Sequence, residues 1–174
     1  MNLQQLLHEY NRGDRDFSAT SLRGVALPHS YLVGINFSCC DLSSSDLSQS
    51  DLSRANLRGA NLTDAELVGT NFSGANLQSI NFIGADLRGA TLIGANLTGA
   101  DLRAADFTGA DLRGADLTDV RLSGANLSNA DLTGACVDAL ELENTDYDGA
   151  TLNGLVTANH AQLSVTSWVS WGAS

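Results

Sequence analysis

Large apolar residues recur at every fifth position of the chain, without interruption, from Phe17 to Leu152. Of these 28 positions, 21 carry Leu, five Phe, one Val and one Tyr. On an α-helix a five-residue step turns by about 500°, which would spread the side chains around the helix. On one long strand an odd step would alternate them between the two faces. The pattern therefore predicts a chain that turns a corner in every repeat and winds into a coil.

The other positions of the repeat support this prediction. The residue two before the apolar one is Ala in 15 of the 28 units, and we expect both to point inward, because residues two apart in an extended segment share a face. The residue two after it is Gly in 15 units, which suits a corner with positive φ. The residue directly before it is Asp or Asn in 19 units, and such side chains bond to turn backbone while facing water.

Segments such as ANLRG (55–59), ADLRG (85–89) and ANLTG (95–99) resemble the pentapeptide-repeat family, and the match runs in phase over 140 of the 174 residues. The resemblance implies an all-β fold, a right-handed quadrilateral (square) β-helix with four pentapeptides per coil and about seven coils. At about 4.8 Å per coil the column is roughly 34 Å long. Most members of this family, which is particularly numerous in cyanobacteria, resemble non-enzymatic scaffolds or protein-interaction modules.

The two ends of the chain depart from the repeat. Apolar residues at positions 3, 6, 7 and 10 have helical spacing and Gly13 follows as a stop, so we predict a helix over 2–11 within an N-terminal cap, residues 1–16. Arg15 falls in an inward position of the first unit. We expect this helix to cover the open end of the first coil, and the alternative role for the helix is to bind a partner. The β-helix is predicted over 17–154. Residues 155–174 are predicted to fold back over the last coil, with a dimer contact or disorder as alternatives.

Catalytic or metal-binding chemistry has little support in the sequence. None of the three His shares a face with a nucleophile or a metal partner, no zinc-ligand spacing occurs, and the Gly residues do not cluster into a phosphate loop. We predict no catalytic, cofactor-binding or metal-binding residues and no cofactor.

The side chains of the adjacent residues Cys39 and Cys40 diverge, because Cys39 lies at a corner and Cys40 points inward. Cys136 lies five coils away. Reduced thiols are expected, and a redox role in the N-terminal coils is the alternative.

The chain is strongly acidic, with 20 acidic residues, nine Arg and no Lys, for a net charge of −11. This balance repels nucleic acid and anionic membranes and attracts basic protein surfaces, although solubility alone also accounts for it. No segment approaches the about 20 apolar residues of a membrane span. The N-terminus lacks the basic start and apolar block of a secretory signal, so a cytoplasmic location is expected.

With twenty residues per coil, residues twenty apart stack on one face. One face then carries a line of carboxylates with Arg88 as its only cation. We predict that this face binds a basic protein surface. The protein is expected to be a monomer or a weak dimer joined through the C-terminal tail. The predicted interaction residues are Asp46, Glu66, Asp86, Asp106, Asp146 and Asp148.

Two further surface features follow from the same stacking. A second face is expected to form a ladder of side-chain amides along the axis, from Asn36, Asn56, Asn76 and Asn96. Ile83 and Ile93 point outward and are secondary candidates for a binding contact.

The resemblance also implies an alternative function. Some family members are acidic rods that mimic duplex DNA and bind type II topoisomerases such as gyrase, typically as dimers joined through a C-terminal module. This chain is similar to them in its repeat and in the sign of its charge. Its column of roughly 34 Å corresponds to about ten base pairs at 3.4 Å each.

Overall fold

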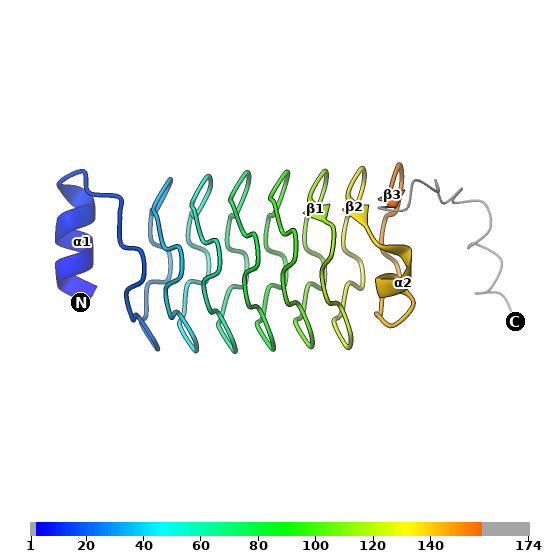
Figure 1. Ribbon diagram of the computed structural model, residues 1–174, viewed down its shortest axis with the longest axis horizontal. Helices are drawn as coiled ribbons and strands as arrows, with labels where there is room; N and C mark the ends of the chain where they lie inside the picture. Colours follow the sequence, from blue (N-terminus) through cyan, green and yellow to red (C-terminus); the bar gives the residue numbers. More distant parts are fainter. Residues whose placement is uncertain (1–2, 158–174) are drawn as a thin grey trace, which may run out of the picture.

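The chain winds into a stack of coils with a helix across its N-terminal end (Figure 1). The computed structural model describes residues 3–157. Its regular elements are α1 (Leu3–Asn11), β1 (Asp116–Leu117), β2 (Cys136–Val137), α2 (Ala139–Leu142) and β3 (Val156–Thr157). The three strands form one parallel sheet in the order β1–β2–β3, in which Asp116, Cys136 and Val156 are in register.

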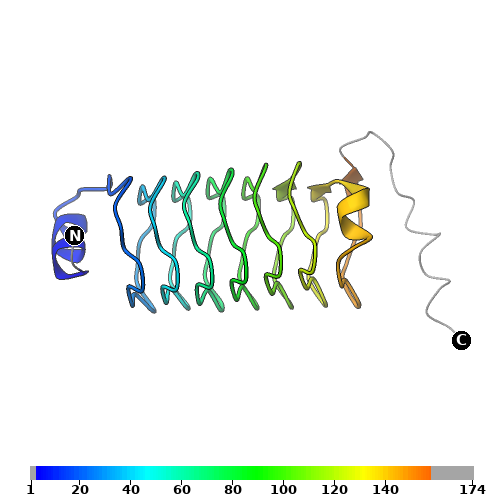
Figure 2. The same ribbon diagram turned by 60° about the horizontal axis from the view of Figure 1, so that its bottom comes forward.

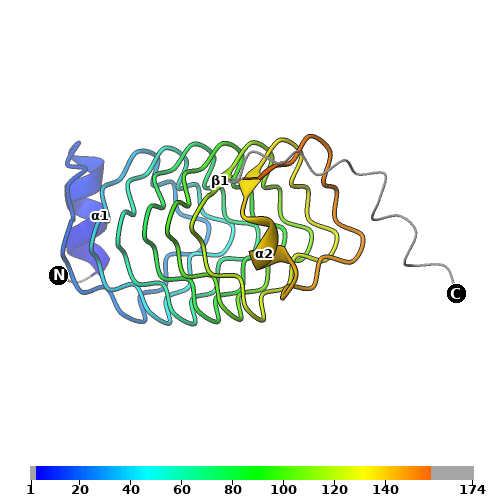
Figure 3. The same ribbon diagram turned by 45° about the vertical axis from the view of Figure 1, so that its right-hand side comes forward.

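Each coil takes twenty residues. From Asp16–Asn36 to Asp131–Thr151, parallel pairing joins the residue before a core position to the residue twenty further on, with Arg121 as the exception. In one such contact the Leu57 N–H donates to the Asn76 carbonyl at 2.8 Å, and the Asn76 N–H donates to the Ala55 carbonyl. The predicted winding period is confirmed, and successive coils lie side by side in all three views (Figures 1, 2 and 3).

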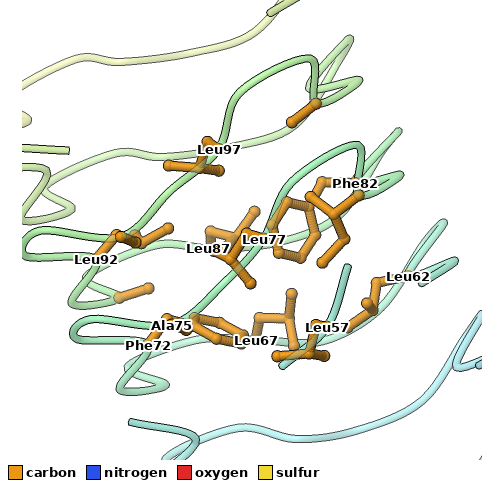
Figure 4. Packing of buried hydrophobic residues seen from close by; sticks show 14 of the residues in the cluster. Leu57, Leu62, Leu67, Phe72, Ala75, Leu77, Phe82, Leu87, Leu92 and Leu97 are labelled. Atoms are coloured by element: carbon orange, nitrogen blue, oxygen red, sulfur yellow. The ribbon is translucent and has the colours of Figure 1, made fainter. Parts of the chain in front are cut away.

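The apolar residues of the repeat fill the inside of the coils. Of the 28 predicted core residues, 26 are buried, and Tyr147 and Leu152 near the end of the described chain are half-buried. Side chains of successive units project into the same interior in Figure 4. There the rings of Phe72 and Phe82 meet edge-on with their centroids 6.0 Å apart. The core therefore runs through the coils as one continuous apolar column.

The corners lie two residues after the core positions, where φ is between +53° and +72° at 26 sites. Fifteen of these residues are Gly, as predicted, and eleven are not. An L-residue in this left-handed region costs about 1–2 kcal/mol relative to the right-handed one. The fold therefore carries backbone strain at the eleven other corners.

Replacing Ala104 by Gly is expected to raise the free energy of unfolding by about 1 kcal/mol, because Ala104 holds φ at +56° and Gly relieves that strain. The control is Ala105→Gly in the next residue, which points inward and is 1% exposed. This change removes a buried methyl group and is expected to lower the same free energy by about 1 kcal/mol. Urea denaturation measures both, and a destabilised Ala104→Gly variant would contradict the assignment of strain.

The N-terminal cap is the helix α1, predicted over residues 2–11 (Figures 1 and 3). Leu6 is fully buried, and the Tyr10 hydroxyl donates to the Val33 carbonyl at 3.1 Å. The inward position predicted for Arg15 is wrong: its side chain is exposed and its guanidinium lies 3.9 Å from the Tyr10 ring centroid. Because burying an unpaired guanidinium is costly, Arg15 instead donates to the Tyr10 carbonyl at 2.8 Å.

The last described coil departs from the repeat at α2. Asp138 caps this helical turn, and its Oδ1 accepts the N–H of Leu140 at 3.0 Å. Leu140 occupies a predicted inward position yet is 63% exposed. The Leu122 N–H donates to the Glu141 Oε2 at 2.9 Å, in place of the ladder carbonyl. Helix-forming residues after a good N-cap, with no Gly at this corner, account for the difference.

The ladder continues beyond the boundary predicted at residue 154. β3 pairs in parallel with β2, and Thr157 lies opposite Val137. Thr157 stands where the next large apolar residue is expected, and it is buried with 3% exposure. The winding therefore outlasts the sequence pattern by three residues. The predictions for the rest of the tail concern residues 158–174, which lie outside the described residues.

Candidate interaction surface

The predicted carboxylates lie in one line along the coils, joined by successive parallel bridges. Asn126 interrupts this line between Asp106 and Asp146. Asp148 lies beside the line, and its N–H donates to the Asp146 Oδ1 at 3.2 Å. We call these six residues the acidic column: Asp46, Glu66, Asp86, Asp106, Asp146 and Asp148.

Five of the carboxylates of the acidic column are Asp, and four of them also hold the turn that follows. The Asp46 Oδ1 accepts the Ser48 N–H at 3.0 Å, and the Asp106 Oδ1 accepts the Thr108 N–H at 2.9 Å. The same bond forms in all 19 units in which Asp or Asn precedes the core residue. One oxygen therefore serves the fold, and at Asp46, Asp106 and Asp146 the second carboxylate oxygen is available to solvent or to a partner.

Charge is distributed unevenly around the coils. The face of the acidic column, residues 25–29 and every twentieth residue after them, holds six carboxylates and one Arg, for a net charge of −5. The other three faces, counted in the same way, have net charges of −2, −2 and −1. Nearly half of the net charge of −11 thus lies on one side of the column.

Arg88 is the cation on this face, and it pairs with Asp86 at 2.6 Å between Nη2 and Oδ2. Hydrogen bonds from Arg88 lower the pKa of the Asp86 carboxyl, and the same contact raises the pKa of Arg88. Two similar pairs lie on other faces, Asp101–Arg103 and Asp111–Arg113. The remaining carboxylates of the acidic column make no ion pair within residues 3–157.

The amide ladder is shorter than predicted. The Asn36 Nδ2 donates to the Asp16 Oδ1 at 2.9 Å, and the Asn56 Nδ2 donates to the Asn36 Oδ1 at 3.1 Å. Bonds from Asn76 and Asn96 to the preceding amide are absent from the part of the chain that the structure describes. The Oδ1 atoms of Asn76 and Asn96 accept the turn bond, as those of Asn36 and Asn56 do.

The other candidates add no reactive site. The Cys40 thiol is buried and donates to the Phe17 carbonyl at 3.0 Å, and burial raises its pKa. Cys39 is exposed, Cys136 is half-buried and all three thiols are free. Ile83 is half-buried and Ile93 is 38% exposed. Residues 3–157 contain no cluster of His, Cys and acidic residues able to hold a metal ion, and no helix with the length and apolarity of a membrane span.

The first coil contains surface residues that the sequence analysis overlooked. Ala26 heads the line of the acidic column and pairs with Asp46. Tyr31 on the next face is 73% exposed, the largest value among the exposed large hydrophobic side chains of the described chain. The available signal was a break in the repeat, because these two units carry Ala and Tyr at the position that is Asp or Asn in 19 units.

Comparison with known proteins gives matches along most of the chain. The sequence-family model described as pentapeptide repeats matches residues 16–54, 40–78, 80–119 and 110–146, in eight copies. HetL, a pentapeptide repeat protein involved in heterocyst differentiation regulation from the cyanobacterium Nostoc sp. strain PCC 7120, is 28% identical. Its match covers 90% of this chain and 94% of HetL, with a TM-score of 0.55.

Two further solved structures are similar. The pentapeptide repeat protein Rfr23 from the cyanobacterium Cyanothece 51142 is 27% identical over 84% of this chain and 100% of its own, with a TM-score of 0.62. QnrB1, a plasmid-mediated fluoroquinolone resistance protein, is 16% identical over 83% and 90%, with a TM-score of 0.55, and shares the fold. No curated protein matches the chain. The similar structures identify the winding as a right-handed β-helix.

Proposed function

Because the chain belongs to the pentapeptide-repeat family, we propose that it is a non-enzymatic scaffold that binds a basic protein surface through the acidic column. In this proposal the β-helix is a square column of about seven coils, and four consecutive coils each hold one carboxylate of the acidic column at a spacing of about 4.8 Å.

The observation that carries the proposal is that the fold does not need the negative charge. The turn bond requires one side-chain oxygen, and an amide supplies it as well as a carboxylate does. Asn126 makes this bond at 2.9 Å within the same line, and Asn36 and Asn56 make it on another face. The turn therefore does not require the negative charge of the acidic column, which is free to act in binding.

The stacking also has an electrostatic cost. Two unit charges about 5 Å apart repel each other by about 0.8 kcal/mol in water, and salt screens part of this. Four consecutive coils place Asp46, Glu66, Asp86 and Asp106 at this spacing, with one Arg among them. A basic surface relieves this repulsion, so charge complementarity favours such a partner.

Neutralising the acidic column is expected to weaken binding to cations without unfolding the protein. This column variant carries Asp46→Asn, Glu66→Gln, Asp86→Asn and Asp106→Asn, and the amide oxygens at positions 46, 86 and 106 retain the turn bonds. We expect its affinity for a lysine-rich peptide to fall at least about tenfold in isothermal titration calorimetry.

The matched control neutralises four carboxylates on other faces: Asp41→Asn, Asp51→Asn, Asp111→Asn and Asp131→Asn. It removes the same total charge, so a small loss of about threefold or less is expected. Equal losses in the two variants would show that net charge, and not the acidic column, determines binding. Affinity purification from the native host, with the column variant as the reference, then identifies the partner.

A type II topoisomerase is the second candidate partner, because the acidic column aligns charges of one sign along a rod, as DNA phosphates are aligned. Under this alternative the purified protein inhibits gyrase supercoiling at low salt and loses the effect as the salt concentration rises. The column variant should then be inactive. Absence of inhibition by the unmodified protein at micromolar concentrations would remove this candidate.

A further inference from the structure

The first coil exposes a part of the ladder that has no partner. In the next coil, the Asp46 N–H donates to the Val25 carbonyl at 2.9 Å, and the Asp46 carbonyl accepts the Leu27 N–H at 2.7 Å. Ala26 and Tyr31 hold the equivalent positions in the first coil, where no coil precedes them. Among the described residues, their backbone N–H and C=O groups make no hydrogen bond.

The helix α1 leaves this edge open. It covers the core through Leu6, and it satisfies the Val33 carbonyl through the Tyr10 hydroxyl. Figure 3 shows α1 lying across the end of the stack. Ala26 and Pro28 are nevertheless exposed, as is Tyr31. Free backbone groups therefore lie at Ala26 and Tyr31, beside accessible apolar side chains, on two faces that meet at the corner of His29. A peptide that bends at this corner can pair with both positions as an added strand.

The chemistry of this edge differs from that of the rest of the chain. Residues 24–40 contain neither an acidic residue nor an Arg, in a protein with a net charge of −11. Pro28 has no backbone N–H, whereas in other units the N–H at this position donates the turn bond to the Asp or Asn two residues earlier. Ala26, two residues before Pro28, has no side-chain acceptor. Donor and acceptor are thus both absent, and this unit is an uncharged variant of the repeat with no unsatisfied turn N–H.

We propose that the edge at residues 26–31 is the docking site for a segment of the partner that bends at the corner of His29, with an apolar residue against Tyr31 and cations that follow it onto the acidic column. The inference rests on the proposed function and adds to it the kind of segment that is recognised. Its main support is continuity, because Ala26 heads the line that continues through Asp46 and Glu66. A second copy of this chain has no Lys and no basic run to offer to that line.

The test uses the full chain and two synthetic peptides with equal numbers of Lys residues. One peptide begins with a short segment of Val and Leu, and the other has Ser in place of that segment. In fluorescence anisotropy, we expect the unmodified protein to bind the apolar–basic peptide at least about tenfold more tightly than the Ser peptide. Equal affinities for the two peptides would overturn the inference.

The variant Ala26→Asp/Tyr31→Asp tests the site itself. It places in the first coil the residues that Asp46 and Asp51 provide at the same positions of the next coil, so the fold accommodates them. We expect the variant to lose the preference for the apolar peptide although it carries two more negative charges. Purely electrostatic binding predicts the reverse, namely tighter binding of both peptides, and that result would contradict the proposed docking site.

A second measurement separates this inference from the proposed function. The column variant described above should bind both peptides weakly and keep its preference for the apolar one. Undiminished binding of both peptides by the column variant would refute the proposed function, and with it the cationic part of the docking segment. If the column variant instead binds both peptides weakly but no longer prefers the apolar one, the edge site is refuted. In sedimentation velocity, a dimer that the Ala26→Asp/Tyr31→Asp variant dissociates would show that a second copy occupies the edge, which would also overturn the proposal.

Discussion

Replacing Phe82 by Ala is expected to lower the free energy of unfolding by about 3–5 kcal/mol. Phe82 is completely buried, and its ring meets that of Phe72 at 6.0 Å between centroids (Figure 4). Ladder hydrogen bonds fix the coils on both sides, which limits how far the walls can close around the cavity. Urea denaturation followed by circular dichroism measures the change, and a loss below about 1 kcal/mol would show that the core is not tightly packed.

The matched control for this substitution is Phe82→Leu. Leu occupies 21 of the 28 core positions, including Leu77 and Leu87 on either side of Phe82 along the chain. A Leu side chain retains most of the apolar contact, so we expect a loss of less than about 1.5 kcal/mol. A similar loss in the two variants would point to a specific role of the aromatic ring in place of simple filling of the interior.

Deleting one residue from the middle of the column is expected to do more damage than deleting a whole coil. Deletion of Arg88 alone shifts every later residue by one position relative to the preceding coils, so that Leu92 and the following core residues fall out of phase with the core positions before the deletion. We expect the coils after residue 88 not to form. Limited proteolysis and circular dichroism measure the loss, and a folded variant would contradict the register of the repeat.

The control for this deletion is removal of residues 76–95, which is one complete coil. It joins Ala75 to Asn96 in the same phase and on the same face, so we expect a folded, shorter column. Removal of residues 86–90 keeps the inward phase but moves Asp106 to another face. That variant should fold and bind the lysine-rich peptide more weakly. Failure of the twenty-residue deletion to fold would contradict the coil as the structural unit.

The periodicity along the chain by itself determined which side chains face inward and which turn a corner. Both properties depend on the geometry of five consecutive residues, which every unit repeats. The 15 Gly corners and the 19 Asp or Asn turn bonds agree with that prediction, and so does α1. The line of the acidic column also follows, but only once twenty residues per coil are taken from the family resemblance.

Tertiary structure alone decided the coil period and the ends of the column. The period depends on pairing between residues such as Leu57 and Asn76, which are distant along the chain, and no five-residue pattern specifies how many units close a coil. Inside the column each unit has a neighbour on both sides, and the ladder imposes one conformation. At the ends this constraint is weaker, so Asp138 starts a helix, Arg15 turns outward and the edge at residues 26–31 remains open.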